Sequence, residues 1–136
     1  MIAIADTGPL YASLDSSDDD HVACAALLER RDLDLVIPAL VVAEVCYLAG
    51  ERMGPHAEAA FLRGLEALEV ELPHPEDWPR IADLVERSAD LPLGAMDASI
   101  VALAERLETD LLLTLDRRRF GAVRMRDGRP FRLLPE

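Results

Sequence analysis

The chain has 136 residues, of which 51% are hydrophobic and only 4% are aromatic. This composition predicts an aliphatic core, and it favours helices packed on a buried sheet over an all-β sandwich. No run approaches the roughly 18 apolar residues of a membrane span, and the N-terminus lacks the basic segment of a signal peptide. We therefore expect one cytoplasmic domain, residues 1–136, with no membrane segment.

The net charge of −12 argues at first against a nucleic-acid partner, but the charges are unevenly distributed. All 14 basic residues are Arg, and residues 117–136 contain seven of them against two acidic residues. That segment therefore carries +5, which leaves −17 for residues 1–116. A basic segment of this kind predicts a surface that binds phosphate groups. A solvated surface, or ion pairs with the acidic body, would also explain it.

Short apolar runs alternate with stretches of helical periodicity along the chain. In chain order, the pattern predicts a strand at 2–6, a helix at 20–31, a strand at 33–37, a helix at 38–49 that Gly50 ends, a helix at 56–67, a strand at 69–72, helices at 75–89 and 95–107, and strands at 111–115 and 131–134. Strands that alternate with helices are typical of an α/β domain whose sheet is mostly parallel.

Four acidic residues adjoin apolar runs, although carboxylates are seldom buried without a partner. Asp6 and Asp116 follow predicted strands, and ligands bind at the carboxyl ends of parallel strands. Asp97 begins a predicted helix, and Glu44 lies about two turns into another one, between apolar neighbours. We predict that the four carboxylates share one pocket and hold one or two Mg²⁺ or Mn²⁺ ions.

Each of these acids also has a purely structural interpretation, which the sequence leaves open. Asp6 could cap a helix or form an Asx-turn, and Asp97 could be an ordinary acid at a helix start. Asp116 could be a turn residue paired with Arg, and Glu44 could lie on a solvated flank. Thr114 could hydrogen-bond a carboxylate or a metal-bound water, or it could simply favour a strand.

Four segments of the chain resemble the PIN-domain family, and more narrowly its VapC toxins. They are Asp6-Thr7-Gly8-Pro9-Leu10, Pro38-Ala39-Leu40-Val41-Val42-Ala43-Glu44-Val45, Pro92-Leu93-Gly94-Ala95-Met96-Asp97-Ala98-Ser99 and Thr114-Leu115-Asp116-Arg117-Arg118-Arg119-Phe120. The resemblance implies a three-layer α/β/α fold with a mostly parallel central sheet. It implies a Mg²⁺- or Mn²⁺-dependent endoribonuclease that cleaves single-stranded loops of structured RNA, such as tRNA or rRNA. It also implies a homodimer that a VapB antitoxin neutralises.

The resemblance assigns roles to individual residues. The catalytic and metal-binding acids are Asp6, Glu44, Asp97 and Asp116; the supporting residues are Thr7 and Thr114; the substrate-binding residues are Arg117, Arg118 and Arg119. Many family members carry a further acidic residue two or three positions after the last Asp. This chain has Arg118 and Arg119 there, so a second metal ion would be held less well.

Three other functions compete with this interpretation. A receiver or aspartate-phosphatase domain also places Asp and Mg²⁺ at strand ends, but it generally needs a Lys, and this chain has none. A catalytically inactive PIN-like scaffold or binding module would have no need of the intact acidic quartet. A structure-specific DNA nuclease would use the same chemistry, but the chain is short for one that also clamps branched DNA.

Overall fold

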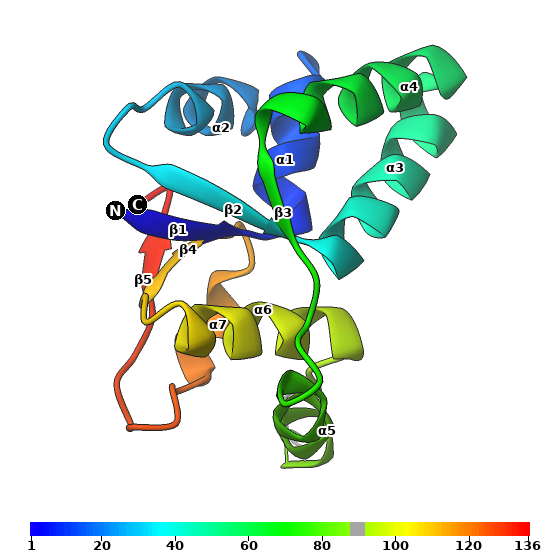
Figure 1. Ribbon diagram of the computed structural model, residues 1–136. Helices are drawn as coiled ribbons and strands as arrows, with labels where there is room; N and C mark the ends of the chain where they lie inside the picture. Colours follow the sequence, from blue (N-terminus) through cyan, green and yellow to red (C-terminus); the bar gives the residue numbers. More distant parts are fainter. Residues whose placement is uncertain (88–91) are drawn as a thin grey trace.

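The computed structural model describes residues 1–87 and 92–136 and contains a sheet of five parallel strands. The strands are β1 (Ile2–Ala5), β2 (Asp34–Pro38), β3 (Glu69–Glu71), β4 (Leu111–Leu113) and β5 (Arg132–Leu134). Their order across the sheet is β3-β2-β1-β4-β5, so β1 lies at the centre between β2 and β4 (Figure 1). The first strand of the chain is therefore paired with a strand that follows it by more than 100 residues.

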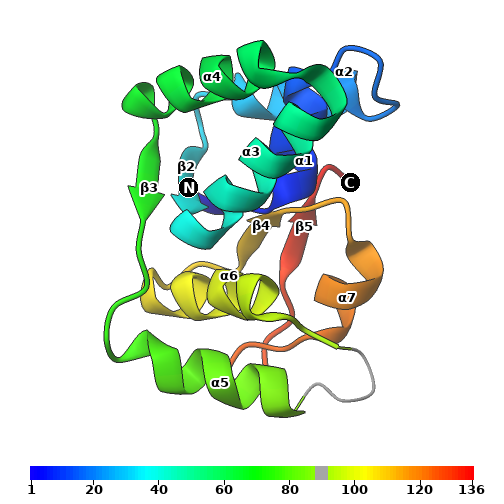
Figure 2. The same cartoon turned by 90° about the vertical axis from the view of Figure 1, so that its right-hand side faces the viewer.

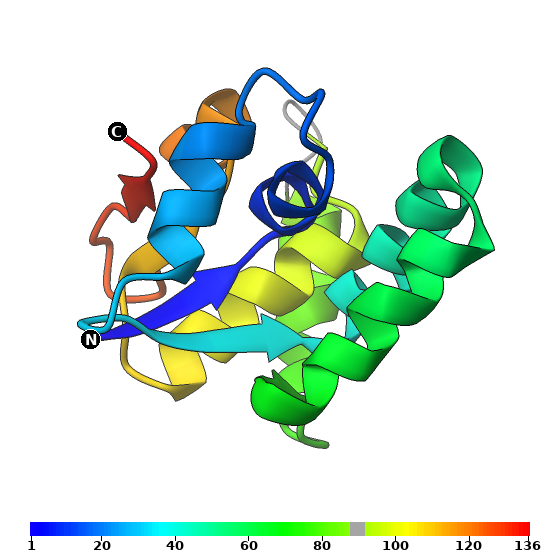
Figure 3. The same cartoon turned by 90° about the horizontal axis from the view of Figure 1, so that it is seen from above.

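Helices cover both faces of this sheet. They are α1 (Thr7–Leu14), α2 (His21–Leu28), α3 (Ala39–Met53), α4 (Pro55–Gly64), α5 (Asp77–Arg87), α6 (Ala95–Arg106) and α7 (Arg117–Ala122), with a 3₁₀ turn, η1, at Leu65–Ala67. Figures 1 and 2 show α1 to α4 on one side of the strands and α5 to α7 on the other. From above, α3 and α4 pack side by side (Figure 3). The predicted three-layer α/β/α fold with a parallel sheet is confirmed.

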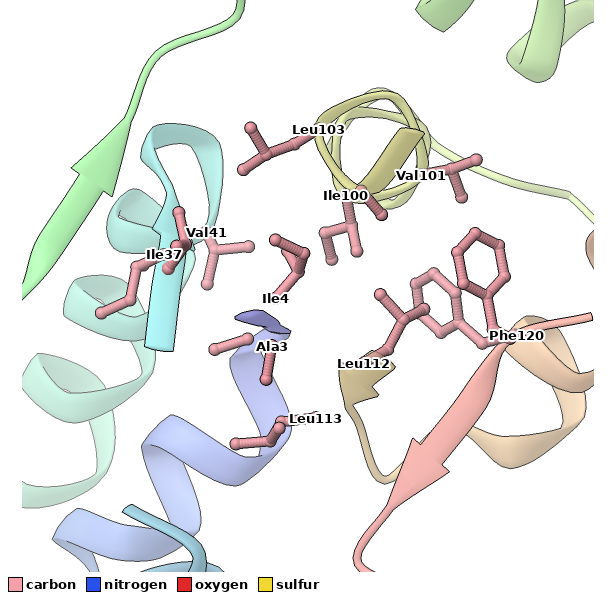
Figure 4. Close-up of a cluster of buried hydrophobic side chains, with 14 of the residues drawn as sticks. Ala3, Ile4, Ile37, Val41, Ile100, Val101, Leu103, Leu112, Leu113 and Phe120 are labelled. Atoms are coloured by element: carbon pink, nitrogen blue, oxygen red, sulfur yellow. The ribbon is translucent and has the colours of Figure 1, made fainter. Parts of the chain in front are cut away.

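The core lies between β1, β4 and the helices on both faces. Ile4 and Leu112 are fully buried, and Figure 4 shows Ile100 of α6 and Phe120 of α7 beside them. Because parallel strands covered on both faces have no solvated side, they appear in the sequence as continuous apolar runs. Helix α6 is buried throughout residues 97–104, since it packs on the sheet and is itself covered by α5. Among the helices of the described ranges, none is long and apolar enough to cross a membrane.

Several predicted element boundaries are wrong. Gly50 does not end its helix: α3 continues to Met53, because packing outweighs the modest cost of a glycine in a helix interior. The break comes at Gly54, whose φ of 91° is a conformation that glycine adopts without strain. The strand predicted at 111–115 ends at Leu113. Helix α5 begins at Asp77 rather than residue 75, and residues 88–89 of the predicted helix lie outside the described residues.

Two helices were absent from the prediction, and both matter for the site. Helix α1 begins at Thr7, where Gly8 and Pro9 are more typical of a turn, although proline is well tolerated in a first helical turn. Helix α7 has only six residues and three consecutive arginines, so it shows no clear apolar periodicity. Each of these helices follows a strand after a connection of one to three residues, and each is capped by an acidic residue.

Candidate active site

Two of the candidate acids stand where neighbouring strands end. The backbone N–H of Asp6 donates to the carbonyl of Leu113 at 2.8 Å, which joins the end of β1 to the end of β4. The Asp6 carboxylate accepts from the N–H of Thr7 at 2.7 Å and caps α1. The Asp116 carboxylate accepts from the N–H of Arg119 at 3.0 Å and caps α7. Both acids are thus helix caps and also occupy the carboxyl edge of the sheet, where ligands bind in parallel folds.

The other two acids reach the same edge from helices. Asp97 lies in the first turn of α6 and is only 5% exposed. Glu44 lies on α3 between the buried residues Val41 and Val45, and its Oε2 accepts from the hydroxyl of Thr7 at 2.9 Å. Val41 and Val45 belong to the core, whereas the Glu44 side chain points towards α1.

All four carboxylates line one open pocket of about 680 Å³. Three consecutive arginines and several residues from α1, α3 and the start of α6 complete it. The lining residues are Asp6, Thr7, Gly8, Glu44, Leu48, Met96, Asp97, Leu115, Asp116, Arg117, Arg118 and Arg119. Every residue that the sequence analysis named for the site lines this pocket except Thr114, which is fully buried directly behind it and contacts Asp6.

Two acids of the pocket, Asp6 and Asp97, resist ionisation because they are buried close to other carboxylates. The pKa of Asp6 is raised to about 6, chiefly by burial; hydrogen bonds from Thr114 and Thr7 oppose the rise, and the nearby carboxylates of Asp97 and Glu44 add to it. The hydroxyl of Thr114 donates to Asp6 Oδ2 at 2.8 Å. Burial also raises the pKa of Asp97, against the opposing charge of Arg119. Acids that resist ionisation beside one another would be stabilised by a cation.

One cation already lies in the pocket, and it belongs to the chain. Arg119 Nη1 is 2.8 Å from Asp97 Oδ2 and 3.4 Å from Asp116 Oδ2. Arg117 instead donates to the carbonyl of Pro135 at 2.6 Å, while Arg118 is exposed at the rim. Of the three arginines predicted to bind substrate, one is therefore engaged with two of the acids.

The donor atoms of the pocket suit a hard divalent ion. Mg²⁺ and Mn²⁺ prefer carboxylate oxygens, and the four acids supply only such ligands. Within residues 1–87 and 92–136, however, no three His, Cys, Asp or Glu side chains are grouped as metal ligands. Three of the four acids instead accept hydrogen bonds from side chains of the protein: Glu44 from Thr7, Asp6 from Thr114 and Asp97 from Arg119. The charge and chemistry fit a divalent ion, provided that the Arg119 side chain moves.

The sequence analysis assigned no role in the site to four residues that line the pocket, Gly8, Leu48, Met96 and Leu115, and two of them make notable contacts. The sulfur of Met96 lies 3.4 Å from the Thr7 hydroxyl oxygen, whose single proton is donated to Glu44, and this contact links the start of α6 to α1. Gly8 lies against Leu115, where an added Cβ would be 3.3 Å from the leucine side chain. The only signal for either was its position within a recognised segment, since neither residue type suggests chemistry.

The fold and the acidic pocket define a class of protein. The chain belongs to the PIN-domain family, whose family model, described as "PIN domain", matches residues 3–124. It is also 37% identical to Ribonuclease VapC26 of Mycobacterium tuberculosis over 134 residues, which are 97% of this chain and 99% of that protein. The predicted family, a PIN-domain protein of the VapC type, is confirmed.

Solved structures share the fold at lower sequence identity. Mycobacterium tuberculosis VapC20, described as a Sarcin-Ricin loop cleaving toxin, superposes with a TM-score of 0.74 at 18% identity, over 81% of this chain and 86% of that one. VapBC2 from Rickettsia felis, bound to a DNA fragment from its promoter, gives a TM-score of 0.73 at 18% identity, over 98% of both chains. At 18% sequence identity, these structural similarities establish that the fold is shared and nothing more.

Proposed function

We propose that this VapC-type protein is an endoribonuclease toxin that hydrolyses RNA phosphodiesters at the acidic pocket, with Mg²⁺ or Mn²⁺ as cofactor. One observation carries the proposal: four acids, two that follow β1 and β4 and two on α3 and α6, line a single pocket. The 37% identity to a protein named as a ribonuclease supports the same class of reaction. Residues 1–136 form, in this proposal, one PIN-like domain that acts in the cytoplasm.

The four acids Asp6, Glu44, Asp97 and Asp116 would hold the metal ion. A divalent ion held by carboxylates supplies two things to phosphodiester hydrolysis, activation of a water and neutralisation of charge on the phosphate. The surrounding residues prepare the acids for this task. The hydroxyls of Thr114 and Thr7 fix the orientation of Asp6 and Glu44, and the hydrogen bond from Thr114 favours the ionised Asp6 carboxylate that a metal needs.

We propose an exposed single-stranded loop of a structured RNA, such as tRNA or rRNA, as the substrate. Proteins read RNA mainly where bases are unstacked, and a loop can enter a pocket that is open to solvent. Arg117 and Arg118, exposed at the rim, offer guanidinium groups to the RNA backbone. VapC20, which shares this fold, is described as cleaving one such loop, the sarcin–ricin loop.

We propose a VapB-type antitoxin and a second copy of the chain as protein partners. The antitoxin is supported by structures of the same fold that are described as VapBC complexes, from Rickettsia felis and from Salmonella typhimurium. The homodimer is inferred from the family resemblance. Co-purification with the product of the adjacent small gene tests the antitoxin, and light scattering of the purified chain tests the dimer.

Substitution of a pocket acid tests the activity. Asp97→Asn removes a carboxylate charge from the pocket while keeping the size of the side chain, so we expect at least about a 100-fold loss of cleavage of a structured RNA. Asp19→Asn, at an exposed acid away from the pocket, is the matched control and should cleave like the wild type. Circular dichroism checks that both variants fold. Undiminished cleavage by Asp97→Asn would refute the assignment.

The same assay separates the competing functions. An inactive scaffold would bind the RNA without cleaving it at any metal concentration. A structure-specific DNA nuclease would prefer a branched DNA flap to the RNA loop. Cleavage of RNA that is abolished by EDTA and restored by Mn²⁺ would agree with neither alternative.

A further inference from the structure

Arg119 lies between two of the four acids of the pocket. Its Nη1 lies 2.8 Å from Asp97 Oδ2 and 3.4 Å from Asp116 Oδ2, and its backbone N–H donates to Asp116 Oδ1 at 3.0 Å. The guanidinium therefore joins the start of α6 to the cap of α7. Two carboxylates that would otherwise repel each other share one positive charge.

The backbone of Arg119 is anchored by its neighbour, whereas its side chain is partly exposed. The next residue, Phe120, is fully buried against the core, so α7 cannot shift easily. The Arg119 side chain is 38% exposed, and it lines a pocket that is open to solvent. Its Nε is buried and has no hydrogen-bond partner among the residues that the structure describes. A guanidinium with an unsatisfied buried donor is held less firmly than a fully paired one.

We propose that Arg119 is an internal competitor of the divalent metal, an inference that rests on the proposed metal-dependent function. Arg119 contacts a carboxylate oxygen of Asp97, one of the four acids proposed to hold the metal, and two cations at one carboxylate repel each other. Metal binding must therefore displace the guanidinium into solvent. In the absence of metal, Arg119 keeps the acidic pocket paired, and it raises the metal concentration at which the site fills.

Metal titration of two variants that lose the same charge tests this competition. Mn²⁺ binding is measured by isothermal titration calorimetry on the full chain after removal of EDTA, for the wild type, Arg119→Gln and Arg118→Gln. Arg118 lines the same pocket but is exposed, so its variant measures the general effect of removing a nearby positive charge. We expect Arg119→Gln to bind Mn²⁺ at least about tenfold more tightly than Arg118→Gln, or about 1.4 kcal/mol.

Thermal unfolding provides a second readout. In EDTA, Arg119→Gln should melt below the wild type, because Asp97 and Asp116 lose their shared partner. Saturating Mn²⁺ should then raise its melting temperature by more than it raises that of the wild type. Circular dichroism spectra establish that both variants are folded before the titration.

The outcomes distinguish this inference from the proposed function. Equal Mn²⁺ affinity of Arg119→Gln and Arg118→Gln, with equal gains in melting temperature, would overturn the competition and leave the metal site intact. Failure of all three proteins to bind Mn²⁺ would overturn both the metal site and the competitor. An affinity of Arg119→Gln at least about tenfold higher than that of Arg118→Gln would support the inference.

Discussion

Replacement of Asp6 by Asn should stabilise the fold at neutral pH. Burial raises the pKa of Asp6 from 3.8 to about 6, so its ionisation in the folded state destabilises the protein by about 3 kcal/mol at pH 7. Asn cannot ionise and therefore avoids this loss of stability. It can accept a hydrogen bond from Thr7 or from Thr114, but not from both as the carboxylate does, which costs about 1 kcal/mol. The expected net gain is about 2 kcal/mol.

The pH dependence gives this prediction its sharpest test. Because the folded-state pKa lies above the unfolded value, the wild type loses stability as the pH rises from 3.8 through about 6. Asp6→Asn lacks this loss, so its advantage in the free energy of unfolding should grow by about 2 kcal/mol between about pH 4.5 and 7.5.

Urea denaturation in EDTA measures the two proteins across that range, and EDTA keeps bound metal from neutralising the pocket. Other titrating groups contribute to both proteins, so they largely cancel in the difference. A difference that stays constant with pH would refute the reasoning, since it would mean that Asp6 is no more difficult to ionise in the folded state than in the unfolded chain.

Two further substitutions test a hydrogen bond beside the site and an ion pair between α5 and α6. Thr114→Val preserves the shape of a fully buried side chain but removes the hydroxyl that donates to Asp6, so chemical denaturation should show a loss of about 1.5–3 kcal/mol at pH 7.5; no loss would show that the bond is unimportant. Arg80→Ala should destabilise the chain by about 3–5 kcal/mol, because it leaves the half-buried Glu105 without its bidentate partner. The control Arg87→Ala, at an exposed pair 3.9 Å apart, should cost less than about 0.5 kcal/mol, and equal losses for the two would contradict this comparison.

Much of the fold could be predicted because its central elements have strong local patterns. The apolar runs of β1 and β4 and the long periodic segment of α6 each specify a buried element without reference to the rest of the chain. The short helices α1 and α7 could not be predicted in this way, because each depends on an Asp cap and on packing against distant residues. The prediction that Gly50 ends its helix was wrong for the same reason, because the contacts of α3 outweigh this local signal.

The sequence could predict which acids form the candidate site, but not which side chains contact one another there. Acids beside apolar runs are unusual, so Asp6, Glu44, Asp97 and Asp116 could be selected from the sequence, and the structure brings them to one pocket. Their roles in catalysis and metal binding stay predictions. The bond between Arg119 and Asp97 had no sequence signal, because it depends on the direction in which α7 leaves the sheet.

The position of β1 at the centre of the sheet has a consequence for folding. Asp6 follows β1, but the partner strand β4 and the cap at Asp116 lie more than 100 residues further along the chain. Pairing strands so distant in sequence closes a long loop, and such non-local contacts form slowly. The acidic pocket therefore forms only after β1 has paired with β4, so a partly folded chain that lacks this pairing cannot bring the four acids together.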